Sequence, residues 1–156
     1  MKKPHFPLFI DLSGKKTVVI GGGAIASRRV DTLLLFCENI EVIAPDVTEE
    51  LQRLAAGGRI RWVADTYREE YLEGAFLVLA ATGCPDCNEE VVRACRAKGI
   101  LVNAVHRKEL CDFYFPAVAV QGSLVAALTA SGMNHKMARQ AREEVAKVLE
   151  RLDEGV

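Results

Sequence analysis

The sequence predicts an α/β fold built on a doubly wound parallel sheet. Short apolar runs rich in β-branched residues alternate with longer segments in which apolar residues recur at helical spacing. Three consecutive glycines separate the first such run from the first helical segment. Strands that alternate with helices imply right-handed crossovers, and these place the strands side by side in one parallel sheet.

The elements follow one another in a regular order. We expect strands at residues 17–20, 40–44, 60–63, 75–80 and 100–103, a short helical turn within 65–73, and helices at about 24–36, 48–56 and 86–98. Glycines close the second and third helices, because glycine readily takes the backbone conformation that ends a helix. The fourth strand is apolar throughout, as expected for a central parallel strand that is buried on both faces.

Size and composition limit the classes of function. The chain has 156 residues, 50% of them hydrophobic, which suits one domain with a real core and a short appendage. A net charge of −1 gives no sign of a nucleic acid or a membrane surface as partner. No apolar segment is long enough to span a membrane, and the first residues lack the apolar region of a secretion signal. We therefore expect a cytoplasmic protein with its five cysteines reduced.

The glycine cluster carries a dinucleotide-binding pattern. Gly21, Gly23 and Ala26 fit the G-x-G-x-x-G/A fingerprint of Rossmann-type domains. Gly21 can take backbone angles closed to other residues, and Gly23 lacks the Cβ that would keep a pyrophosphate from the backbone. Backbone N–H groups and the positive end of the next helix would then receive the phosphates. The alternative is an ordinary glycine-rich turn, but the strand before it and the helix after it favour dinucleotide binding.

The pattern changes after residue 104. Two strand-like runs, 117–120 and 124–129, flank a Gln-Gly-Ser turn and predict a hairpin, and a charged helix follows from 136 to about 152. A hairpin and one helix bury little apolar surface alone, so we expect them to pack on the sheet edge or on a second copy of the chain, as a homodimer. The predicted division is an NAD-binding Rossmann domain over 1–112 and a dimerisation and substrate-cleft region over 113–156.

Five segments resemble precorrin-2 dehydrogenases in their order and spacing. They are Phe6-Pro7-Leu8-Phe9, Val19-Ile20-Gly21-Gly22-Gly23, Ala80-Ala81-Thr82, Val102-Asn103 and Asp112-Phe113-Tyr114-Phe115-Pro116-Ala117. This NAD-dependent enzyme of siroheme synthesis occurs alone or as the first module of multifunctional siroheme synthase. The resemblance implies NAD as cofactor, a tetrapyrrole substrate, oxidation of precorrin-2 to sirohydrochlorin and, in some relatives, insertion of Fe²⁺ as a further substrate. We expect the small helical region that usually follows in this family to be largely absent.

Carried over by position, the resemblance places the cofactor contacts at the strand ends. They are Gly21, Gly22, Gly23, Ala24 and Ile25 after the first strand, Pro45 and Asp46 after the second, Ala81 and Thr82 after the fourth, and Asn103 in the fifth. Asp46 could hold a ribose hydroxyl, which favours NAD over NADP. Arg28 and Arg29 could instead attract a 2′-phosphate, but they lie inside the first helix, where solvation at the surface is the simpler interpretation.

The chain departs from the family at the catalytic position. The resemblance implies an Asp after the fifth strand as the catalytic and chelating group, and here His106 follows instead. Histidine takes a proton near neutral pH, and its neutral ring can ligate ferrous iron, so His106 is a candidate catalytic residue and metal ligand. The alternative is that the acid site is lost and His106 is a loop residue. Asp112 is a second catalytic candidate, although it more simply braces the loop before Phe113.

A further departure lies in the loop before the last helix, where the family usually has a glycine-rich stretch ending in Ser-Pro. The hydroxyls of Thr129 and Ser131 remain available to a substrate carboxylate, and Asn134 is a good helix N-cap. His135 adds a candidate carboxylate or metal contact, and Arg139 on the helix is a cation suited to carboxylates. Solvated surface residues are the alternative for these side chains.

The C-x-x-C pair of Cys84 and Cys87 stays open between redox chemistry, metal binding and no special role, because a structural zinc needs about four ligands. Two other functions also stay open for the chain. One is a non-catalytic module that holds NAD and a tetrapyrrole and delivers it to a partner enzyme. The other is an NAD-sensing regulatory domain without a cleft for an anionic macrocycle.

Overall fold

The computed structural model describes residues 5–131 and 133–153, and for His135 and Asp153 it describes the backbone alone. The chain divides into two compact units. We call Phe9–Phe113 the sheet unit, and Met1–Leu8 together with Tyr114–Val156 the hairpin unit.

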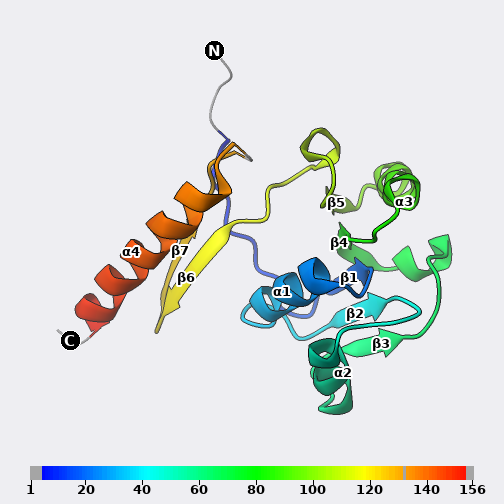
Figure 1. Cartoon of the computed structure of the whole chain (residues 1–156), viewed down its shortest axis with the longest axis horizontal. Helices are drawn as coiled ribbons and strands as arrows, with labels where there is room; N and C mark the ends of the chain where they lie inside the picture. Colours follow the sequence, from blue (N-terminus) through cyan, green and yellow to red (C-terminus); the bar gives the residue numbers. More distant parts are fainter. Residues whose placement is uncertain (1–4, 132, 154–156) are drawn as a thin grey trace. The chain divides into compact units, whose positions relative to one another are not determined.

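The sheet unit contains a five-stranded parallel sheet (Figure 1). Its strands are β1 (Lys16–Ile20), β2 (Ile40–Ile43), β3 (Arg61–Val63), β4 (Ala75–Ala80) and β5 (Leu101–Ala104). They lie in the order β3-β2-β1-β4-β5, so the chain steps outward from β1 to β3, returns to β4 and steps outward again to β5. The predicted doubly wound α/β fold is confirmed. The change of direction between β1 and β4 creates a crevice at their carboxyl ends, which is where such sheets bind ligands.

Helices connect the strands and cover both faces of the sheet. They are α1 (Ala24–Leu33), α2 (Glu49–Ala56) and α3 (Pro85–Lys98), with short 3₁₀ turns η1 (Glu69–Leu72) and η2 (Lys108–Leu110). On one face, Val18 and Val78 pack in a cluster with Val91 of α3. Their strand neighbours Val19 and Leu79 point to the opposite face and are also fully buried. Burial on both sides explains why these strands are apolar without alternation.

Some helix ends differ from the prediction. The first helix was expected to reach residue 36 but ends at Leu33, because a tight turn follows in which the amide of Phe36 donates to the carbonyl of Leu33 at 2.8 Å. The second helix begins at Glu49 because Thr48 is its N-cap, with Oγ1 accepting from the amide of Leu51 at 3.3 Å. The other boundaries move by about a residue, as is common where helices and strands fray.

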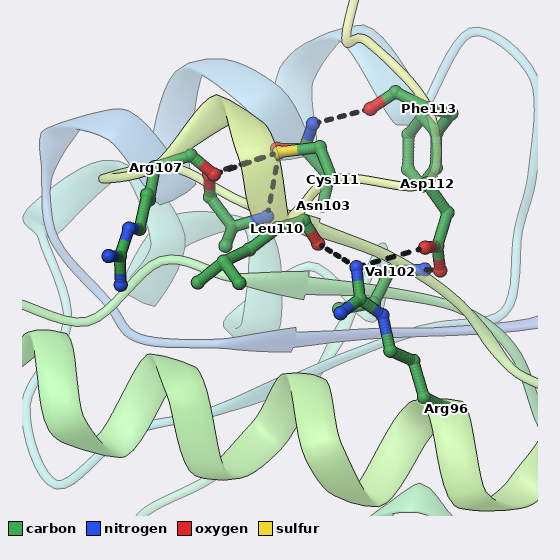
Figure 2. Close-up of polar contacts among 9 residues, drawn as sticks. Arg96, Val102, Asn103, Arg107, Leu110, Cys111, Asp112 and Phe113 are labelled. Carbon is green, nitrogen blue, oxygen red and sulfur yellow. Dashed lines mark hydrogen bonds and ion pairs between the residues drawn. The ribbon is translucent and has the colours of Figure 1, made fainter.

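β5 is an edge strand, and the segment after it covers that edge (Figure 2). The amide of Asp112 donates to the carbonyl of Val102 at 2.9 Å, and its carboxylate accepts from the amide of Val102 at 3.1 Å. The thiol of Cys111 accepts from the amide of Ala104 at 3.3 Å and donates to the carbonyl of Ala104 at 3.2 Å. Arg96 of α3 lies 3.6 Å from the Asp112 carboxylate. The outer backbone groups of β5 are therefore satisfied without another strand.

The hairpin unit confirms the predicted hairpin and helix. It contains the antiparallel strands β6 (Ala117–Gln121) and β7 (Leu124–Leu128), with α4 (His135–Asp153) packed mainly on β6. Gly122 takes a left-handed φ of 55° at the turn. Asn134 caps α4 as predicted, because its side-chain oxygen accepts from the amide of Met137 at 2.9 Å. Within residues 5–131 and 133–153, no helix has the length and apolar character needed to cross a membrane.

Candidate functional site

A cleft opens at the carboxyl ends of the parallel strands. Its volume is about 370 Å³, within the usual range for small-molecule sites. The loops after β1, β2 and β4 supply most of its wall, and the loop after β3 and the start of α3 complete it. The lining residues are Ile20, Gly21, Gly22, Gly23, Ile43, Ala44, Pro45, Asp46, Thr66, Tyr67, Ala81, Thr82, Gly83 and Cys87. Seven of the predicted cofactor residues are among them: Gly21, Gly22, Gly23, Pro45, Asp46, Ala81 and Thr82.

The three glycines of the loop are needed for different reasons. Gly21 has a φ of 118°, and a Cβ there would lie 2.3 Å from the carbonyl oxygen of Ala81. A Cβ on Gly22 would lie 2.3 Å from the carbonyl oxygen of Asp46. The fold itself therefore requires these two glycines. At Gly23, by contrast, a Cβ would meet no described atom within 4 Å, so its bare backbone is left open to the cleft.

The start of α1 provides hydrogen-bond donors beside this loop. Gly23 is the N-cap of α1 and has no side chain to accept from the first amides of the helix. Ala26 is fully buried, as expected for the small residue that brings the helix against the sheet. Ala24 and Ile25 follow Gly23 and are exposed, but they are not among the residues that line the cleft.

The acidic residues at β2 have separate environments. Asp46 is exposed and lines the cleft, where its carboxylate can accept from a ligand hydroxyl. Glu41 is buried near the start of β2, with Lys16 at 3.3 Å and Arg61 at 2.9 Å. These ion pairs account for Glu41 and leave Asp46 as the acidic residue of the cleft.

Tyr67 is a cleft residue that the sequence did not reveal. Its hydroxyl oxygen is buried, and within the described residues it has no hydrogen-bond partner. Burial raises the pKa of the Tyr67 hydroxyl to about 12, with smaller contributions from nearby cysteines and glutamates. The hydroxyl is therefore neutral and buried, while Tyr67 as a residue lines the cleft. A tyrosine in a polar loop carries no pattern that predicts this position.

Asn88 connects the cleft with His106. It is fully buried in α3, and its side-chain oxygen accepts from the amide of Thr82 at 3.0 Å. Its side-chain nitrogen donates to the carbonyl of Thr82 at 3.0 Å and lies 3.4 Å from Nδ1 of His106. His106 itself is exposed on the turn after β5 and does not line the cleft. Asn88 was also missed from the sequence, although a buried polar residue near a helix start is an unusual feature.

Asn103 and Arg29 form a pair inside the sheet unit. Asn103 is 3% exposed, and its side-chain oxygen accepts from the guanidinium of Arg29. Its side-chain nitrogen donates to the carbonyl of Phe113 at 2.8 Å (Figure 2). Asn103 is not among the residues that line the cleft, and its amide is engaged in these packing contacts, so the cofactor contact stays a prediction. The expectation that Arg29 is a solvated surface residue is wrong, because the helix turns it toward β5. Burial lowers the pKa of its guanidinium from the ordinary value.

The contacts of Asp112 agree with the bracing interpretation. Its carboxylate is shared between the amide of Val102 and the guanidinium of Arg96 (Figure 2). It does not line the cleft. The structure therefore gives Asp112 a role at the sheet edge and supplies no support for the predicted catalytic role.

The predicted substrate residues all belong to the hairpin unit. The Thr129 hydroxyl accepts from the amide of Ser131 at 3.1 Å, and the Ser131 hydroxyl lies 2.8 Å from Nδ1 of His5. Ser131 has a left-handed φ of 53°. Arg139 donates to Glu143 at 3.1 Å, one helical turn further on. The side chain of His135 lies outside the described residues.

The cysteine pair lies at the start of α3. Cys84 is the exposed N-cap of the helix and Cys87 lines the cleft, where burial raises the pKa of the Cys87 thiol. In the part of the chain that the structure describes, no three His, Cys, Asp or Glu side chains form a group that could hold a metal ion. The predicted metal role of His106 therefore gains no second ligand here.

Comparisons with known proteins identify the family. Residues 8–117 match the family described as "Putative NAD(P)-binding". The chain belongs to this NAD(P)-binding family. It is 40% identical over 145 residues to the Probable multifunctional siroheme biosynthesis protein HemA of Ruminiclostridium josui, covering 92% of this chain and 28% of that protein. It is 32% identical over 145 residues to the Siroheme synthase of Photorhabdus laumondii, covering 93% of this chain and 31% of that one.

A solved structure extends the likeness to the fold. The structure of SirC, precorrin-2 dehydrogenase, superposes with a TM-score of 0.82 at 27% identity, covering 92% of this chain and 70% of that one. The predicted resemblance is thus confirmed, while the chain spans less than a third of the length of the curated relatives it matches.

The cleft of this NAD(P)-binding chain fits a dinucleotide. The bare backbone of Gly23 and the uncapped start of α1 suit a pyrophosphate. The carboxylate of Asp46 suits a ribose hydroxyl. The site therefore combines an anion cradle with polar groups at its wall.

Proposed function

We propose that this chain is an NAD-dependent precorrin-2 dehydrogenase, which oxidises precorrin-2 to sirohydrochlorin in siroheme biosynthesis. One observation carries the proposal: a glycine-loop cleft where the strand order changes direction between β1 and β4, with its third glycine open, in a chain similar to siroheme synthases and to a precorrin-2 dehydrogenase. NAD, when bound, supplies the acceptor for the hydride that leaves the substrate.

The residues of the sheet unit bind and orient the cofactor. The backbone at Gly22 and Gly23 and the first amides of α1 hold the pyrophosphate. Asp46 accepts from an adenosine ribose hydroxyl and repels a 2′-phosphate, so NAD is preferred to NADP. Thr82 forms the opposite wall, and Asn88 fixes it there through both of its backbone groups.

Substrate recognition follows from charge. The substrate carries several carboxylates, which hydroxyl groups, amides and cations bind well. Thr129, Ser131, Asn134, His135 and Arg139 are the candidates in the hairpin unit, and His106 is the candidate after β5. Arg139→Gln is expected to raise the KM for precorrin-2 with little change in the affinity for NAD.

An anaerobic turnover assay tests the proposal. Purified chain is mixed with precorrin-2 and NAD, and NADH and sirohydrochlorin are followed by absorbance. We expect NADH to form in step with sirohydrochlorin, with NAD preferred to NADP and the preference reduced in Asp46→Ala. Binding of NAD and tetrapyrrole without turnover would favour the delivery module instead. Binding of NADH alone would favour the regulatory domain.

Ferrous iron is a second substrate that the resemblance implies. Because no three His, Cys, Asp or Glu side chains among the described residues form a metal-binding group, the proposal covers the oxidation alone. Incubation of the chain with sirohydrochlorin and Fe²⁺ tests that activity separately.

The hairpin unit supports a homodimer. A two-stranded hairpin covered by one helix is marginal alone, and β6 and β7 leave Val120, Leu124 and Val125 between 37% and 44% exposed. We propose that a second copy of the chain covers them. Sedimentation equilibrium should give twice the chain mass, and Leu124→Lys should reduce it.

A further inference from the structure

The orientation of the Asn88 side chain is fixed by its contacts with Thr82. The amide of Thr82 can only donate, so the atom of Asn88 at 3.0 Å from it is the oxygen. The carbonyl of Thr82 can only accept, so the atom of Asn88 at 3.0 Å from it is the nitrogen. The Thr82 hydroxyl adds a third contact, at 2.7 Å from the oxygen. If the oxygen and nitrogen of the Asn88 amide were exchanged, the nitrogen would face the N–H of Thr82 and the oxygen would face its carbonyl. Neither pair could form a hydrogen bond.

This orientation bears on which ring nitrogen of His106 carries the hydrogen. The Asn88 nitrogen faces Nδ1 of His106 at 3.4 Å, and an amide nitrogen only donates. In the neutral ring, Nδ1 then accepts from the amide and the hydrogen lies on Nε2. A hydrogen on Nδ1 would point at a hydrogen of the Asn88 amide, and the two groups could not form a hydrogen bond.

We propose that Asn88 is a positioning residue that holds His106 as the Nε2–H tautomer, so that His106 donates a hydrogen bond to an anionic oxygen of the ligand. The Nε2 lone pair is then absent, so His106 is neither a proton acceptor nor an iron ligand through Nε2. The anionic oxygen that accepts from Nε2 belongs to a carboxylate of the ligand. Its identity as a side-chain carboxylate of the tetrapyrrole rests on the proposed function, whereas the tautomer does not.

The same residue couples His106 to the cleft. The oxygen and one N–H of the Asn88 amide contact Thr82 at the wall of the cleft, and the second N–H faces His106. Because Asn88 is fully buried while His106 is exposed, the asparagine is the fixed member of the pair. The Nε2–H donor of His106 is therefore held in a fixed position relative to Thr82 and the cleft.

Nitrogen NMR tests the tautomer directly. The chain has three histidines, and a His→Gln variant of each assigns its ring signals in uniformly ¹⁵N-labelled protein. At alkaline pH we expect Nε2 of His106 to be protonated and Nδ1 unprotonated. Asn88→Asp puts an acceptor opposite Nδ1 and should move the hydrogen to Nδ1, whereas Asn39→Asp, at an exposed asparagine, should leave the His106 signals unchanged. A wild-type His106 protonated on Nδ1 overturns the proposal.

Two variants of the exposed His106 test its role without disturbing the core. Gln places an N–H donor where Nε2 was, and Asn places one where Nδ1 was. We expect His106→Gln to keep the KM for precorrin-2 near that of the wild type. We expect His106→Asn to raise it about tenfold to a hundredfold, the usual cost of a lost hydrogen bond to a charged group. Equal loss of kcat in both variants would identify a proton acceptor and overturn the proposal.

The two proposals fail in distinguishable ways. If wild-type protein does not turn over precorrin-2, the proposed function fails, while the NMR result for His106 stands or falls independently. If wild-type protein turns over and His106 carries its hydrogen on Nδ1, the inference about Asn88 fails and the proposed function remains.

Discussion

Gly21→Ala and Gly23→Ala form a matched pair that separates folding from cofactor binding. Both replace a glycine of the same loop by the same residue, and both glycines line the cleft. At Gly21 the added methyl group would lie 2.3 Å from a backbone oxygen, at a φ of 118°. At Gly23 the methyl group meets no described atom within 4 Å, and the backbone angles of φ −81° and ψ −175° are open to any residue.

The structure gives the size of each effect. Overpacking against backbone and an unfavourable φ each cost about 1–3 kcal/mol, so Gly21→Ala should lower the free energy of unfolding by at least about 2 kcal/mol. At Gly23, alanine is the poorer N-cap by about 0.5 kcal/mol, but it loses less chain entropy on folding by a similar amount. Gly23→Ala should therefore leave stability nearly unchanged. Its methyl group stands where a pyrophosphate would approach, so we expect NADH affinity to fall about tenfold to a hundredfold.

Urea unfolding and calorimetry measure the two effects. Trp62 is the one tryptophan of the chain, and its indole N–H donates to the carbonyl of Ala44 at 2.9 Å, so its fluorescence reports unfolding of the sheet unit. NADH titration gives the affinity of each folded variant. The reasoning is refuted if Gly23→Ala unfolds as early as Gly21→Ala, or if it binds NADH as tightly as the wild type.

Four further changes test the packing and electrostatics. Asp112→Ala should cost about 1–3 kcal/mol in urea unfolding because it leaves a buried strand amide unpaired, whereas Asp112→Asn, which keeps an acceptor, should cost less. Tyr67→Phe should raise the free energy of unfolding by about 1 kcal/mol, since it removes an unpaired buried hydroxyl, and a loss of stability would contradict the described site. Burial raises the pKa of Asp31 above its ordinary 3.8, so the ionised carboxylate opposes folding; Asp31→Asn should stabilise the chain at neutral pH, and the gain should vanish below pH 3.8. Alkylation followed by mass spectrometry should label exposed Cys84 first and spare Cys95 until unfolding, because Cys95 is fully buried and burial raises its pKa to about 12.

The backbone of the sheet unit was predictable because local signals agreed with one another. Uninterrupted apolar runs fit strands that are covered on both faces, and the glycine loop fits a turn between a strand and a helix. The end of α1 was less predictable. Leu34 continues the helical pattern of apolar residues, yet the chain turns at Leu33 and buries Cys37. The helical spacing of apolar residues does not show where a helix must end so that the chain can reach the next strand.

The side-chain contacts of the site depended on residues far apart in the chain. Arg29 and Asn103 are 74 positions apart, and Asn88 and His106 are 18 apart. An arginine inside an amphipathic helix suggests solvent, and only the position of β5 shows that this one turns inward. For Asp112 the sequence favoured a brace for the loop before Phe113, and its contacts with Val102 agree with a bracing role, although they join it to a strand 10 positions away.

The segment that covers β5 also prevents further strands from adding to this edge of the sheet. An uncovered edge strand offers its amides and carbonyls to any passing extended chain, and such pairing can continue from molecule to molecule into an aggregate. Here an invading strand would first have to expel the Cys111 thiol and the Asp112 carboxylate from the positions it needs. Oxidation of the Cys111 sulfur would replace the thiol that donates to the carbonyl of Ala104, so the closure of this edge depends in part on the redox state of one atom.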